Sequence, residues 1–178
     1  MNAGIIGMGK YVPEKAIPNK DFENVLDTSD EWIRSRTGIE NRFIAENEET
    51  SDLAYKAAVQ AIENASITPD QIGLIVVATV TQDQNFPSVA CQIQERLGIS
   101  GCGAMDVSAA CSGFIYGTAI AKQFIESNSY EYILVVGVEK LSKITDWKDR
   151  NTAVLFGDGA SAAVIGKVSE GRGILAYE

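Results

Sequence analysis

The sequence predicts an α/β fold built on a mixed sheet that is parallel in its middle. Helical and strand-like segments alternate through most of the chain, and its C-terminal stretch has the turn spacing of a hairpin. Residues 72–79 and 132–138 are almost wholly apolar and rich in β-branched side chains, as expected of strands covered on both faces. The 178 residues, 46% hydrophobic and 22% charged, are expected to form one domain with a sizeable core.

The chain is expected to begin with a strand and a short helix. Residues 3–12 mix apolar residues with glycines, a pattern typical of a strand. These glycines do not make a phosphate loop, because no Lys followed by Ser or Thr stands at the required spacing. The helix is expected over residues 20–26, with Asn19 as its cap.

Two further helices carry clear signals at their ends. Thr28 or Ser29 is expected to cap the first of them, and Gly38 to end it. Thr50 or Ser51 is expected to cap the second, a long helix whose small apolar residues recur at helical spacing. Those small residues indicate close packing against the sheet.

The middle of the chain continues the alternation of helices and strands. A helix is expected over residues 87–97, opened by Pro87 and stopped by Gly98. A short strand at residues 103–108 then leads through small residues directly into a helix over residues 111–127. This strand-to-helix junction is the geometry in which many nucleophiles are presented.

The C-terminal stretch predicts two turns and two strands. The turns are expected at residues 158–159 and 170–171, and the strands at residues 160–168 and 173–178. The last strand has nothing after it to pair with. We therefore expect the chain to be part of a longer polypeptide.

Composition excludes several classes of function. A net charge of −9 and a pI near 4.6 argue against a nucleic-acid partner. The longest apolar runs are too short to cross a membrane, and the N-terminus does not have the pattern of a secretory signal, so a cytoplasmic protein is expected. Three cysteines at irregular spacing and no histidine predict neither a disulfide framework nor a zinc site.

Cys111 is the candidate nucleophile. It stands where the strand at residues 103–108 turns into the following helix, so unpaired N–H groups and the positive end of the helix dipole would stabilise a thiolate. The same N–H groups could bind the oxyanion that forms when a thiolate attacks a thioester. Four small neighbours are expected to leave room for substrate: Ala109, Ala110, Ser112 and Gly113.

The alternative is that Cys111 is a small buried hydrophobe on a helix that is apolar on most sides. A buried cysteine is more often of this kind; the place of Cys111 at the junction weakens this alternative, but spacing alone leaves both interpretations open. Cys91 and Cys102 are interpreted as structural.

Five blocks, in order along the whole chain, carry a resemblance to a known family: residues 27–33 (DTSDEWI), 37–39 (TGI), 86–88 (FPS), 109–114 (AACSGF) and 156–160 (FGDGA). Together they resemble β-ketoacyl-acyl-carrier-protein synthase III. The resemblance implies a thiolase-like fold of two similar halves in a five-layer αβαβα arrangement. Residues 1–178 would be the N-terminal half, and the C-terminal half would be absent from this chain.

The resemblance also implies a reaction and partners. Cys111 would take an acyl group from acyl-coenzyme A, and the acyl-enzyme would condense with malonyl-acyl-carrier-protein with loss of carbon dioxide, which starts a fatty acid chain. Coenzyme A would enter as a substrate thioester, with no separate cofactor and no metal. The enzyme would be a homodimer, with no nucleic-acid or membrane partner.

Site residues follow from the same resemblance. Trp32 and Arg36 would flank the adenine of coenzyme A, and Thr28 and Arg150 would contact the same nucleotide end. Leu141 and Phe156 would lie along the acyl pocket, and Phe86 would reach into the neighbouring subunit. Without the family, the residues alone would be read as an ordinary half-buried aromatic, surface charges and core.

The sequence departs from the family in two ways. The histidine and asparagine that complete the family's site come from the second half, and this chain has no histidine. The chain alone is therefore expected to bind coenzyme A or form an acyl-enzyme without condensing it. Ser161 stands where the family has glycine, which suggests a local adjustment.

Three alternatives remain beside this interpretation. The chain could be a non-catalytic thiolase-fold subunit or dimerisation module, against which the intact Cys111 junction argues. It could belong to a related condensing enzyme that uses another primer or acceptor. A cysteine hydrolase is disfavoured, because it would need a base that this chain lacks.

Overall fold

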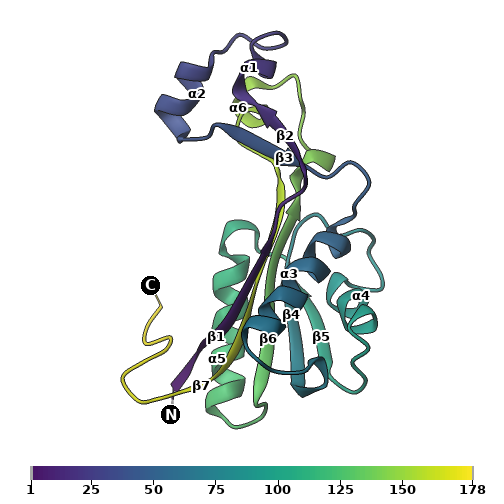
Figure 1. Cartoon of the computed structure of the whole chain (residues 1–178), viewed down its shortest axis with the longest axis vertical. Coiled ribbons are helices and arrows are strands. Elements are labelled where there is room, and N and C mark those ends of the chain that lie inside the picture. Colours follow the sequence, from purple (N-terminus) through teal and green to yellow (C-terminus); the bar gives the residue numbers. More distant parts are fainter. Residues whose placement is uncertain (1, 178) are drawn as a thin grey trace.

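The computed structural model describes residues 2–177 and contains a five-stranded mixed sheet (Figure 1). The strand order across the sheet is β1 (Asn2–Tyr11), β7 (Asp158–Val168), β6 (Tyr132–Lys140), β4 (Ile72–Ala78) and β5 (Gly103–Val107). β4 runs parallel to both of its neighbours, while β7 runs antiparallel to β6 and to β1. The predicted α/β class and the parallel centre of the sheet are confirmed.

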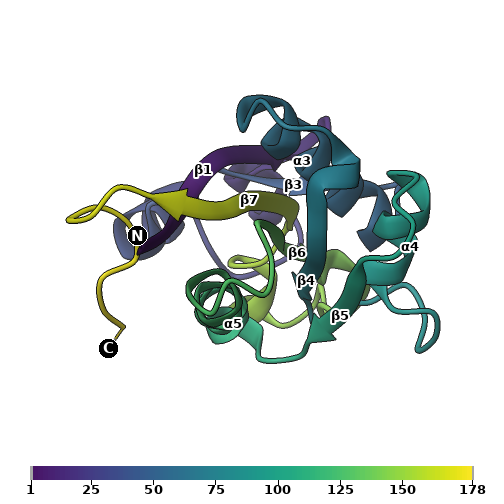
Figure 2. The same ribbon diagram turned by 90° about the horizontal axis from the view of Figure 1, so that it is seen from below.

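Helices cover both faces of this sheet. α3 (Thr50–Asn64) and α4 (Val89–Arg96) lie on one face, and α5 (Gly113–Glu126) lies on the other (Figure 2). Side chains of β4 alternate between the two cores: Ile75 packs on the side of α3 and α4, and Val76 on the side of α5. Both are fully buried, and such a side chain contributes about 1.5–3 kcal/mol to folding.

A smaller substructure stands at one end of the sheet (Figure 1). It contains a two-stranded antiparallel sheet and three short helices: β2 (Lys15–Pro18), β3 (Asn41–Ile44), α1 (Asn19–Phe22), α2 (Asp30–Thr37) and α6 (Arg150–Ala153). Arg42 of β3 is 3% exposed, and its Nε donates to the carbonyl of Val154 at 2.8 Å. This buried contact joins β3 to Val154, the residue that directly follows α6. Sequence patterns predicted neither β2, β3 nor α6.

Three 3-10 turns complete the elements: Pro69–Gln71, Ala110–Ser112 and Leu141–Lys143. The first leads into β4, the second contains Cys111, and the third follows β6.

Several expected helix ends were wrong. Asn19 does not cap the first helix but lies within it, buried, where its side-chain amide donates to Asp30 at 2.8 Å. That helix ends at Phe22, well before residue 26. The cap of α3 is Glu49, whose N–H donates to the carboxylate of Asp52 at 2.7 Å, and the expected caps Thr50 and Ser51 are the first two residues of the helix.

The remaining caps are partly confirmed. Ser29 accepts from the N–H of Trp32, and Gly38 ends α2 with φ of 73°. α4 starts at Val89 behind a Ser88 cap rather than at Pro87.

Two expectations about the C-terminal stretch were also wrong. Asp158 and Gly159 are the first residues of β7 rather than a turn, because both pair with β6. Residues 173–177 form no strand; the N–H of Ile174 makes a single contact with the carbonyl of Ala3 at 2.9 Å. Within residues 2–177 no helix is long and apolar enough to cross a membrane.

Candidate active site

Cys111 lies in the 3-10 turn between β5 and α5. The predicted strand-to-helix junction is confirmed, but α5 begins at Gly113 rather than at residue 111. The turn is closed by backbone hydrogen bonds: the N–H of Ser112 donates to the carbonyl of Ala109 at 3.2 Å, and the N–H of Gly113 donates to that of Ala110. Ala110 has φ of 44°, a left-handed conformation that non-glycine residues rarely adopt. Such local strain persists where the surrounding structure holds it, often at functional sites.

The Cys111 thiol is exposed at the N-terminal end of α5. Its backbone N–H donates no hydrogen bond to any group of the described chain. A free N–H beside a reacting sulfur, at the positive end of a helix dipole, can bind a developing oxyanion. The alternative of a buried structural cysteine is therefore wrong for Cys111, whereas Cys91 and Cys102 are partly buried.

Gly113 makes room for the sheet and not for substrate, contrary to expectation. A Cβ at Gly113 would lie 2.9 Å from the Cβ of Ala78 at the end of β4, far inside van der Waals contact. The absence of a side chain lets the start of α5 approach β4 closely. Because Cys111 lies two residues before Gly113, this contact limits how far Cys111 can lie from the sheet.

A hollow of about 480 Å³ opens beside Cys111. Its lining comes from the turn and from the ends of three strands: Ala78, Ala110, Cys111, Phe114, Gly137, Val138, Glu139, Gly157, Asp158, Gly159, Ala160 and Ser161. These strand ends meet at one edge of the sheet, beyond the carboxyl ends of β4 and β6, where α/β proteins commonly bind ligands. Ser161, where the family resemblance predicts glycine, therefore lies in the wall of the hollow.

Asp158 holds one wall of the hollow in place. Its carboxylate accepts hydrogen bonds from the N–H of Ala45 at 2.8 Å, the N–H of Ser142 at 2.8 Å and the hydroxyl of Ser142 at 2.6 Å. Asp158 is 6% exposed, and these three donors satisfy its buried charge. The carboxylate thus joins the start of β7 to the small substructure and to the turn after β6.

Four residues predicted to meet the nucleotide end of coenzyme A come together on the small substructure. The guanidinium carbons of Arg36 and Arg150 lie 5.1 Å and 4.9 Å from the ring centroid of Trp32. Arg150 also donates to the carbonyl of Asp27 at 2.9 Å. The neighbouring Thr28 has a buried hydroxyl without a partner in the described chain, which is a free hydrogen-bonding group at this cluster.

The residue before the Arg150 helix is an acidic cap. Asp149 accepts from the N–H of Asn151 at 2.9 Å, and this hydrogen bond holds the pKa of Asp149 below its usual value. The cap fixes the start of the short helix that carries Arg150.

The three remaining predicted site residues lie outside the lining of the Cys111 hollow. Leu141 is half-buried in the 3-10 turn after β6, and Phe156 is partly exposed next to Gly157, which does line it. Phe86 is 87% exposed in the loop between β4 and α4.

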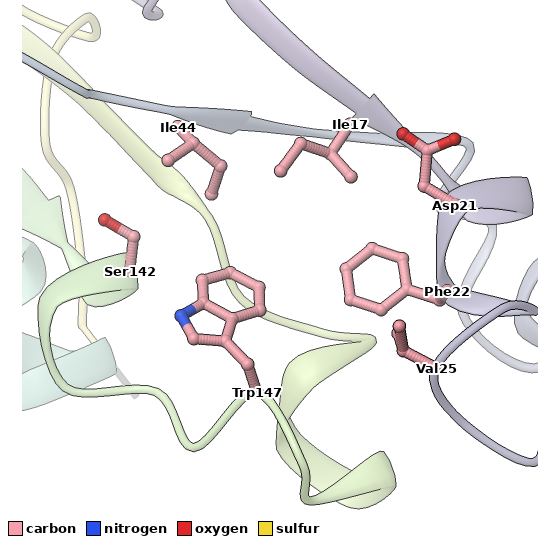
Figure 3. A pocket seen from close by; sticks show the side chains of 7 residues that line it. All are labelled: Ile17, Asp21, Phe22, Val25, Ile44, Ser142 and Trp147. Carbon is pink, nitrogen blue, oxygen red and sulfur yellow. The ribbon is translucent and has the colours of Figure 1, made fainter.

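A second hollow, of about 380 Å³ and mainly apolar, lies between the small sheet, α1 and the segment after β6 (Figure 3). Phe22 and Trp147 lie next to each other in its lining, with ring centroids 6.2 Å apart. Ser142 lines this hollow and donates a hydrogen bond to Asp158 of the Cys111 hollow, so the linings of the two hollows are in direct contact.

Sequence reasoning missed Glu139 and Asp158 as members of the site. Glu139 lines the Cys111 hollow near the end of β6, where a charged residue directly follows the buried apolar run and interrupts the sequence pattern. That interruption was the available signal. No group of three or more potential metal ligands occurs among residues 2–177.

An α/β sheet with a cysteine presented just before a helix, beside a hollow at the strand ends, is the arrangement of a thiolase-like domain. Residues 105–178 match the family of 3-oxoacyl-[acyl-carrier-protein] synthase III. The whole chain is 63% identical to β-ketoacyl-[acyl-carrier-protein] synthase III of Geobacillus kaustophilus and covers 58% of that relative. Over its whole length the chain is therefore similar to this family.

Solved structures agree with this assignment. The 3-oxoacyl-[acyl-carrier-protein] synthase III of Aquifex aeolicus superposes with a TM-score of 0.92 at 48% identity, over 94% of this chain and 55% of that one. The priming β-ketosynthase of the R1128 polyketide pathway superposes with a TM-score of 0.90 at 38% identity, over 94% and 50% of the two chains. The chain thus spans a little over half the length of the relatives it matches.

Proposed function

We propose that this chain is the N-terminal half of an acyltransferase and decarboxylating condensing enzyme that starts fatty acid synthesis. The observation that carries the proposal is the exposed Cys111, with its unbonded N–H just before α5, beside a hollow of about 480 Å³ that could hold a short acyl group. The identity to curated synthases over the whole chain supports it.

In the first step, the Cys111 thiolate attacks the thioester carbonyl of acyl-coenzyme A. A bond forms between Cys111 sulfur and the carbonyl carbon, negative charge develops on the carbonyl oxygen, and the N–H of Cys111 can donate to it. The tetrahedral intermediate then collapses, the bond to the sulfur of coenzyme A breaks, and coenzyme A leaves as a thiolate that takes up a proton.

In the second step, malonyl-acyl-carrier-protein loses carbon dioxide, and the resulting carbanion attacks the acyl carbonyl. The bond to Cys111 breaks and the thiolate is regenerated. We assign the donors that stabilise the malonyl thioester oxygen to a histidine and an asparagine of the C-terminal half, since the present chain has no histidine.

Coenzyme A is proposed to bind with its adenine on the cluster of Trp32, Arg36, Arg150 and Thr28. A planar indole and a guanidinium can stack on a base, and Arg can also pair with phosphate. Leu141 and Phe156 are proposed to border the acyl path once the other half is in place.

The working protein is proposed to be a cytoplasmic homodimer. Phe86 is a large apolar side chain with 87% exposure in a polar loop, and such residues are enriched at protein interfaces. The second candidate function is that of a related condensing enzyme with another acyl primer or acceptor, because a polyketide priming ketosynthase shares the fold and is 38% identical in sequence.

Product analysis tests this function. The full-length protein is incubated with acetyl-coenzyme A and malonyl-acyl-carrier-protein, and acetoacetyl-acyl-carrier-protein is measured by mass spectrometry. Formation of that product supports the proposal. Product with another acceptor but not with malonyl-acyl-carrier-protein would favour the second candidate, and no product with any acceptor would favour a non-catalytic module.

A further inference from the structure

Glu139 fastens the base of the loop that carries Phe86. This loop spans residues 79–88, between β4 and α4. One carboxylate oxygen of Glu139 accepts from the N–H of Val80 at 3.0 Å, and the other accepts from the hydroxyl of Thr81 at 2.6 Å. The Thr81 hydroxyl in turn accepts from the N–H of Lys140 at 2.8 Å, so it is already oriented toward Glu139 as a donor.

Two helices hold the same loop elsewhere. At α3, the hydroxyl of Thr50 donates to the carbonyl of Thr81 at 2.6 Å, and the N–H of Ser51 donates to the carboxylate of Asp83. The far end is fixed because Asp106 of β5 accepts from the N–H groups of Val89 and Ala90 at the start of α4, at 2.9 and 2.8 Å. The loop therefore has a defined path, and Phe86 projects from it into solvent.

Glu139 belongs to the Cys111 hollow as well. It lines that hollow beside Ala78, the last residue of β4. Glu139 thus lines the Cys111 hollow and, through its carboxylate, fixes the first residues of the exposed loop. No other side chain that lines the hollow makes a hydrogen bond to residues 79–88 within the described chain.

We propose that Glu139 is a positioning residue that sets the range of acyl chains accepted at Cys111. By holding Val80 and Thr81, which follow the lining residue Ala78, it keeps this side of the hollow and the loop that carries Phe86 in one arrangement. When these hydrogen bonds are lost, the wall of the hollow can move outward, and the rate of acylation by longer acyl chains rises relative to that by acetyl. The inference deepens the proposed acyl transfer and rests on it.

The substitution Glu139→Gln tests this arrangement with little change in side-chain volume. Both oxygens of Glu139 accept from donors, and the Thr81 hydroxyl cannot easily reverse its role because it accepts from Lys140. In Glu139→Gln an amide NH₂ must therefore face a donor, with little change of volume. Thr81→Val removes the same contact from the other side, and Thr81→Ser keeps the hydroxyl.

The experiment measures single-turnover acylation of the full-length protein by a series of straight-chain acyl-coenzyme A donors from acetyl upward, followed by intact mass. The readout is the ratio of the rate with the longer donors to the rate with acetyl. Glu139→Gln and Thr81→Val are each expected to raise this ratio roughly fivefold, the size expected for one lost buried hydrogen bond. Thr81→Ser is expected to retain the wild-type ratio.

The matched control is Glu126→Gln, which alters a carboxylate at the far end of α5 that accepts from the N–H of Ala3 at 3.4 Å. It should leave the ratio unchanged. A merely structural role for Glu139 would lower the rates with all donors by the same factor, because only the folded fraction changes. That result, or a lower ratio of longer-donor to acetyl rates, overturns the proposal for Glu139 while leaving the proposed acyl transfer intact. A folded wild-type protein that no donor acylates overturns the proposed function itself.

Discussion

The guanidinium of Arg150 lies over the ring of Trp32, 4.9 Å from its centroid, although the two residues come from α6 and α2. Arg36, one turn along α2, lies 5.1 Å from the same centroid. The small substructure thus assembles an aromatic ring with two cations from segments far apart in the sequence. Such a cluster suits a ligand that carries both a base and phosphates.

Substitution at this cluster should weaken coenzyme A binding without affecting the chemistry at Cys111. Trp32→Ala removes the stacking surface, and we expect a loss of about 1–2 kcal/mol in the binding of coenzyme A, or roughly tenfold in Kd. Isothermal titration of the full-length protein measures it. The control is Trp147→Phe, a ring outside the cluster; equal weakening in both variants would contradict the assignment.

The close approach of Gly113 to Ala78 predicts a variant that can be rescued. Gly113→Ala places a Cβ 2.9 Å from that of Ala78, and we expect it to cost about 1–3 kcal/mol in the free energy of unfolding and to slow acylation of Cys111. Ala78→Gly removes the opposing Cβ. The double variant should regain most of both losses, measured by urea denaturation and by acylation rate, and additive losses would show that the two positions do not interact.

Arg42 is expected to be a major determinant of stability in the small substructure. Arg42→Met leaves the carbonyl of Val154 and the side chain of Asn19 without a buried donor, at a cost of about 3 kcal/mol in the free energy of unfolding. Urea denaturation tests this. The matched control is Arg34→Met, which breaks an exposed ion pair with Glu40 and should change stability little; similar losses in both would argue against the role of burial.

Cys102 and Cys111 should react at different rates because their surroundings differ. Burial raises the pKa of the Cys102 thiol above its ordinary value, so less thiolate is present at neutral pH. Its alkylation by iodoacetamide should therefore lag behind that of the exposed Cys111, and should accelerate as the pH rises through the raised pKa. Peptide mapping after timed labelling measures both, and labelling of Cys102 at pH 7 as fast as Cys111 would be inconsistent with this account.

Much of the central sheet could be predicted from the sequence. β4 and most of β6 are short, continuous apolar runs rich in β-branched residues. This composition is typical of strands buried on both faces, as the structure shows them to be. The junction at Cys111 was equally clear, because a short strand runs into a helix through small residues. The cap at Ser29 and the end at Gly38 follow from local backbone preferences that tertiary contacts did not override.

Other features depended on contacts between distant segments. β2 and β3 have four residues each, and Arg42 in β3 is polar yet buried, so no pattern marked the small sheet. Asp158-Gly159 has the composition of a turn, but pairing with β6 and three donors to Asp158 hold it in a strand. Likewise, nothing near Glu139 in the sequence reveals that it binds residues 80 and 81.

The most direct test of the whole account is the mass of the acyl-enzyme. The full-length protein is incubated with acetyl-coenzyme A, and intact masses of the wild type, Cys111→Ala and Cys91→Ala are compared, with the modified peptide mapped. The account predicts one added acetyl group on Cys111 in the wild type and in Cys91→Ala, and none in Cys111→Ala. An acetyl group on Cys91 or Cys102, or no adduct on a folded wild-type protein with any acyl-coenzyme A donor, would contradict it.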